Sequence, residues 1–124
     1  MKNKISKNKN LLSITFWNID YKKVLQLLKF LKVDNVSVFI DEGQEYSFKE
    51  IITIDDFVKH ILDIKEPILI FDNLVTQCLM NEELEILSNK KILIDFNLGE
   101  NMTYILINLN NANIFEEDVR KIMK

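Results

Sequence analysis

Apolar residues recur along this chain at two spacings, and the alternation of the two predicts where strands and helices lie. Residues 11–17 are rich in β-branched and aromatic side chains, which is typical of a strand. Apolar positions then repeat at helical spacing from Tyr21 to Leu31, and Asp20 stands where a helix N-cap is expected. We therefore expect a strand followed by a helix in this part of the chain.

The rest of the chain continues the alternation of strand and helix patterns. Further strands are expected at residues 35–41, 45–48, 68–71, 91–97 and 102–108, and further helices at residues 54–62, 74–88 and 113–122. Within residues 74–88, Asn81-Glu82-Glu83 resembles a fresh helix N-terminus, so a break there is an alternative to one continuous helix. The turn residues Asp41, Glu42 and Gly43 separate two of the strands, which predicts a hairpin there.

This order of elements favours the α/β class, with a mixed β-sheet that contains hairpins and is covered by about four helices. The α+β class is the alternative. A chain of 124 residues fits one domain, which we assign to residues 11–124. Residues 1–10 have four lysines and no apolar periodicity, so we expect a flexible basic N-terminal arm.

The apolar runs are too short for a membrane segment or a secretion signal. None is longer than four residues, whereas a spanning helix needs about 20. Cys78 is the single cysteine, which excludes an internal disulfide and fits a reducing compartment. These features predict a cytoplasmic protein that has no membrane partner.

Charge is distributed unevenly along the chain. The formal net charge is −3, but residues 11–124 hold 12 basic against 19 acidic side chains. Residues 34–56 carry seven acids and only one basic residue, Lys49. Arg120 is the single arginine, and arginine is the usual bidentate reader of phosphates and guanine. We therefore expect no direct nucleic-acid binding, and a basic protein as the partner.

Three strand-like runs end in or near an aspartate, at Asp41, Asp72 and Asp95. Carboxylates at the ends of strands can hold Mg²⁺ with substrate phosphates, so a Mg²⁺-dependent enzyme or nucleotide-binding domain is one hypothesis. However, the chain has no glycine-rich phosphate loop, one histidine and one cysteine. We therefore favour loop acids and helix caps, with no enzyme activity, no cofactor and no metal.

The acidic hairpin region is the stronger candidate for a site, because Tyr46 stands there among acids and tyrosine is common at binding hot spots. The sequence thus favours a small acidic protein-binding module of bacterial or phage type. Its role would be an inhibitor or immunity protein that blocks a nuclease toxin or a defence nuclease. A structural subunit that associates with itself is a further alternative. The expected partner-binding residues are Asp41, Glu42, Glu45, Tyr46, Glu50, Asp55 and Asp56.

Overall fold

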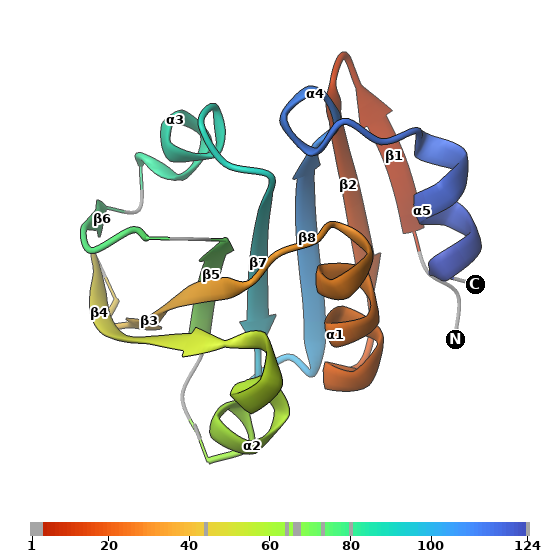
Figure 1. The fold of residues 1–124 in the computed structure, drawn as a ribbon. Helices are drawn as coiled ribbons and strands as arrows, with labels where there is room; N and C mark the ends of the chain where they lie inside the picture. Colours follow the sequence, from red (N-terminus) through yellow and green to blue (C-terminus); the bar gives the residue numbers. More distant parts are fainter. Residues whose placement is uncertain are drawn as a thin grey trace.

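The chain forms one eight-stranded β-sheet in a computed structural model that describes residues 4–43, 45–63, 65, 68–72, 74–79 and 81–123. The strand order is β1-β2-β8-β7-β5-β3-β4-β6 (Figure 1). The strands are β1 (Lys4–Asn8), β2 (Leu11–Phe16), β3 (Asn35–Asp41), β4 (Glu45–Thr53), β5 (Ile68–Asp72), β6 (Cys78–Leu79), β7 (Ile92–Asn97) and β8 (Met102–Asn108). The helices are α1 (Tyr21–Phe30), the 3-10 helix η1 (Ile54–Asp56), α2 (Phe57–Ile61), α3 (Glu83–Leu87), α4 (Leu109–Ala112) and α5 (Glu116–Ile122).

The combination of one sheet with several helices agrees with the predicted class, but the prediction of a mixed sheet was wrong. Every pairing between described strands is antiparallel. The strand–helix–strand units do exist, since α1 joins β2 to β3 and α2 joins β4 to β5. The two strands of each unit point in the same direction, although they are not neighbours in the sheet. Other strands are inserted between the members of each pair. Apolar periodicity predicts the units but carries no signal for this insertion.

One face of the sheet is covered by a layer of helices, in which α1 contacts both α2 and α5 (Figure 1). The Asp20 carboxylate caps α1 by accepting a hydrogen bond from the Lys23 amide at 2.9 Å, as the sequence predicted. Val24, Leu27 and Leu28 are fully buried against the sheet. Burial of each such side chain contributes about 1.5–3 kcal/mol, so this layer forms the main core.

The opposite face is covered in part by a segment between β5 and β7, which we call the covering segment (residues 74–79 and 81–90). It packs on a second, smaller apolar cluster that includes Phe39, Phe71 and Leu93. The Val75 amide donates a hydrogen bond to the Ser37 hydroxyl at 2.8 Å, which fixes the start of the segment above β3. β6 then pairs with β4, and α3 follows. The rest of this sheet face has no helix over it in Figure 1.

Several helices are shorter than the sequence predicted. Residues 54–61 form η1 and α2, and the described residues of 74–88 form the strand β6 and then the five-residue helix α3. α4 was not predicted, so the described part of the chain has five α-helices in place of about four. None of the helices in the described ranges is long and apolar enough to cross a membrane.

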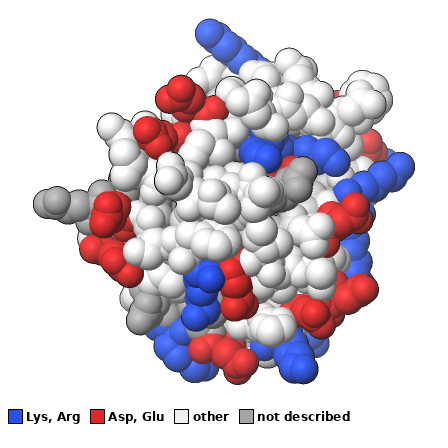
Figure 2. Space-filling model, turned by 60° about the vertical axis from the view of Figure 1, so that its left-hand side comes forward, with Lys and Arg blue, Asp and Glu red and all other residues white. Residues whose placement is uncertain are grey.

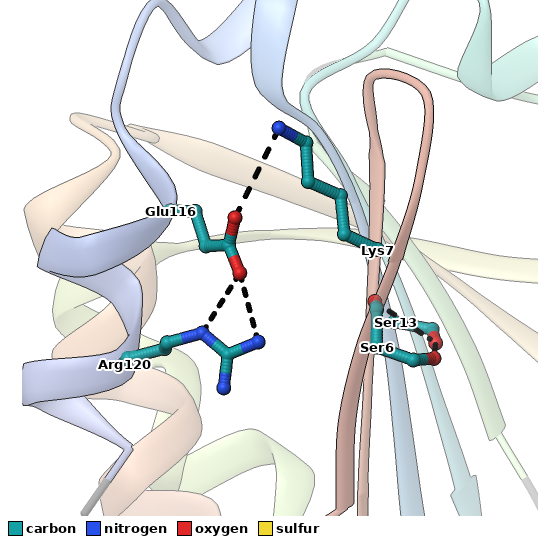
Figure 3. A network of polar contacts seen from close by, with 5 residues as sticks. All are labelled: Ser6, Lys7, Ser13, Glu116 and Arg120. Atoms are coloured by element: carbon teal, nitrogen blue, oxygen red, sulfur yellow. Dashed lines mark hydrogen bonds and ion pairs between the residues drawn. The ribbon is translucent and has the colours of Figure 1, made fainter.

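The prediction of a flexible arm over residues 1–10 was wrong for residues 4–8, which form the edge strand β1 beside β2. Residues 1–3 lie outside the described part of the chain. Side chains on both faces hold β1 in place (Figure 3). The hydroxyls of Ser6 and Ser13 are 2.7 Å apart, and Lys7 lies 3.9 Å from Glu116 of α5, which also binds Arg120.

Candidate protein-binding surface

β3 and β4 form the predicted hairpin, and local hydrogen bonds close its turn. The Gly43 amide donates to the Asp41 carboxylate at 2.9 Å, and the Glu42 amide donates to the carbonyl of Glu45 at 3.0 Å. Gly43 has a φ of 99°, a region that glycine enters without strain. The Asp41 carboxylate and the backbone of Gly43 are therefore structural parts of the turn, whereas Glu42 contributes only its backbone amide.

The seven predicted partner-binding residues do not form one patch. Asp41, Glu42 and Glu45 lie at the turn, whereas Asp55 and Asp56 lie in η1 beyond the other end of β4. A nine-residue strand spans about 26 Å, so these two groups are far apart. Between them, Glu50 lies 3.6 Å from the imidazole of His60 on α2, on the helical face of the sheet.

Tyr46 contacts an acid that the sequence did not assign to the site. Its hydroxyl donates a hydrogen bond to Glu83 of α3 at 2.7 Å, which links β4 to the covering segment. Burial and the neighbouring Glu83 charge raise the pKa of Tyr46, so the hydroxyl stays protonated. The start of a helix at residues 81–83 was visible in the sequence, but the contact between Tyr46 and Glu83 spans 37 positions and has no local signal.

Asp95 lies on the same face of the sheet as this pair. Burial, together with the charges of Glu83 and Asp41, raises the pKa of the Asp95 carboxyl to about 6. Burial and the same acidic surroundings also raise the pKa of Tyr104 on β8. The covering segment and the strands beneath it therefore share an acidic region. Glu83 and Tyr104 are the members that sequence reasoning missed.

The three strand-end aspartates do not meet at one edge. The carboxylate of Asp72 accepts hydrogen bonds from the amides of Lys91 and Ile92 at 2.9 and 3.2 Å, which joins the end of β5 to the start of β7. Asp72 lies opposite Val36 near the start of β3, whereas Asp41 is the last residue of that strand, so the two aspartates lie at opposite ends of it. Alternation along the strands also puts Asp95 on the opposite face from Asp72. Among the described residues, no three histidine, cysteine, aspartate or glutamate side chains form a group able to hold a metal.

Cys78 and His60 lie in ordinary structural environments. Cys78 is buried in the smaller cluster, where burial and the charges of Glu83 and Glu82 raise the pKa of its thiol to about 12. The thiolate needed for nucleophilic attack is therefore disfavoured. His60 is an exposed residue of α2, as its position off the apolar stripe predicted. Neither arrangement resembles a nucleophile with its base.

Apolar side chains are exposed along β4, beside the acids of the hairpin. Phe48 is 40% exposed and Ile51 is 43% exposed, and both lie on the face away from the main helices. The ring of Phe48 packs edge-on against buried Phe39, with centroids 5.7 Å apart, which fixes its orientation. On β6, Leu79 is 49% exposed. Figure 2 brings this side of the molecule forward, and it shows acidic and basic groups interspersed around a largely uncharged area.

Comparisons with known proteins give no relative, since no family model, curated protein or solved structure matches this chain.

Proposed function

We propose that this chain is a small protein-binding module of the cytoplasm that acts as an inhibitor or immunity protein. It would block a basic partner, such as a nuclease toxin or a defence nuclease, by covering part of the partner's surface. The observation that carries the proposal is the outer surface of the β3–β4 hairpin. There, Phe48 and Ile51 are exposed on the face away from the main helices, Glu42 and Glu45 are exposed at the turn, and Lys49 is the single basic residue of the hairpin.

This surface has the two features that a binding site for a basic protein needs. Aromatic and aliphatic side chains supply the apolar area whose burial stabilises a complex, and Phe48 is already held by Phe39. The exposed carboxylates at the turn of the hairpin favour encounter with a positively charged surface, an effect that salt screens. Glu42 and Glu45 are exposed at the turn, so the partner can reach them without any change in the fold.

The proposal is tested by reversing the charge of the hairpin without disturbing its turn. The variant carries Glu42→Lys, Glu45→Lys and Glu50→Lys, and it retains Asp41 because that carboxylate binds the Gly43 amide. The control carries Glu85→Lys, Glu100→Lys and Glu117→Lys, which change the net charge equally at exposed sites outside the hairpin. Both variants are compared with the wild type in capture experiments from the source cell's lysate.

We expect the wild type and the control to retain one stoichiometric basic protein at low salt, and the hairpin variant to lose it. The purified partner should also lose its own activity, for example nuclease activity, in an equimolar mixture with the wild type. Equal retention by the hairpin variant would remove this surface as the site. Failure to inhibit a captured enzyme would remove the inhibitor role.

A further inference from the structure

The outer edge of β4 is open over most of its length. On its inner side β4 pairs with β3 along the whole strand, but on its outer side β6 pairs only with Glu45 and Tyr46. Within the described ranges, no strand lies beside residues 47–53 on that outer side. A strand edge presents a row of backbone donors and acceptors that fits another extended chain. Seven residues are enough for a typical strand pairing.

The two long edges of the sheet differ in how well they are protected. β1 forms the other edge and carries Lys4 and Lys7 within five residues, and charged edge residues of this kind oppose pairing with other chains. Residues 47–53 contain one lysine, Lys49, and one acid, Glu50, beside the exposed Phe48 and Ile51. A β-bulge at Lys49 shifts the register with β3 and directs Phe48 and Ile51 to the same face of the sheet. The β4 edge is therefore the one suited to accept a strand.

A second copy of this chain is a poor occupant for this edge. Two identical antiparallel strands related by a two-fold axis place the residue at the axis opposite itself. The centre of residues 47–53 is Glu50, so full pairing would set one Glu50 against the other. Like charges directly opposite each other destabilise a strand pair. An incoming strand with a lysine or arginine near Glu50 would instead gain an ion pair.

The ends of the open edge favour the same kind of occupant. Glu45 precedes it and Asp55 follows it, and both are exposed. We propose that the β4 edge, residues 47–53, binds an extended, positively charged segment of a partner protein as a ninth strand of the sheet. Backbone hydrogen bonds to the edge would hold the segment, and its alternate side chains would cover Phe48 and Ile51. This inference rests on the proposed function and names the form in which the partner binds.

The test uses three capped seven-residue peptides as probes. The first alternates lysine and valine and can form a basic strand. The second replaces each lysine by glutamate, and the third replaces each valine by proline, which keeps the charge but removes the backbone donors at those positions. Each peptide is titrated to millimolar concentration into the full chain, and binding is followed through backbone amide shifts in NMR spectra.

We expect the lysine–valine peptide to shift the amides of residues 47–53 most, with an affinity that falls as salt is added. The glutamate and proline peptides should leave these amides unchanged. No shift with the lysine–valine peptide, or equal shifts with the proline peptide, would overturn the inference. Concentration-dependent shifts of the same amides in the free protein, with a dimer in sedimentation, would also overturn it, because a second copy would then be the occupant.

Two matched variants separate this inference from the proposed function. Ile51→Lys adds a positive charge to the open edge and should weaken binding of the lysine–valine peptide at least tenfold. Leu84→Lys on α3, at a position that is 61% exposed, should leave binding of this peptide unchanged. A second outcome is a partner that is captured and inhibited by the wild type and by Ile51→Lys, but not by the hairpin charge variant. That result would support the proposed function and overturn strand addition. Peptide binding at the edge without any captured partner would support strand addition and remove the inhibitor role.

Discussion

Asp95 carries its charge in surroundings that disfavour it, and this gives a prediction at the scale of one residue. Its folded pKa of about 6 lies above the ordinary value of 3.8, because burial and the acids Glu83 and Asp41 oppose ionisation. The folded state therefore binds the proton more tightly than the unfolded state does. The protonated Asp95 carboxyl therefore stabilises the folded state fully below pH 3.8, and this contribution is lost as the pH rises through about 6.

Asp95→Asn should remove this dependence. We expect the variant to be more stable than the wild type by about 1–2 kcal/mol at pH 7.5, after allowance for the partial exposure of the site, and equally stable near pH 3.5. Urea unfolding across this pH range measures the difference. The control is Asp63→Asn at an exposed position, which should follow the wild type. A variant that is less stable than the wild type at pH 7.5 would contradict the assignment.

At the scale of elements, Cys78 can report how firmly the covering segment closes. The thiol is 3% exposed and its pKa is about 12, so alkylation at pH 8 requires the segment to open. Tyr46→Phe removes the hydrogen bond to Glu83, a loss of about 1 kcal/mol, and should raise the alkylation rate about fivefold. Ser47→Ala, next in sequence but without that bond, is the control. Equal rates in all three proteins would show that the Tyr46 contact does not hold the segment closed.

The elements also show where sequence reasoning succeeded and where it failed. β2, α1 and the β7–β8 hairpin were predicted because their apolar periods and caps are local signals. Residues 74–79 were predicted to be helical because Val75 and Cys78 lie at helical spacing, but both side chains pack in the smaller cluster from residues that form no helix, and α3 begins only at Glu83. The hairpin acids were located by their density in the sequence. Glu83 was missed because folding alone brings α3 to Tyr46.

At the scale of the whole molecule, β1 protects one edge of the sheet, and its removal should change how the protein associates. Without residues 1–9, the outer edge of β2 would be bare, and β2 is rich in apolar residues such as Leu12 and Ile14. We expect a loss of about 2 kcal/mol, a fall in Tm of roughly 5–10 °C and concentration-dependent scattering of light. The control carries Lys4→Gln and Lys7→Gln, which keep the strand but remove its charges, so it should retain most of the Tm. A deletion variant that melts like the wild type and stays monodisperse would show that β1 contributes neither stability nor protection of the β2 edge.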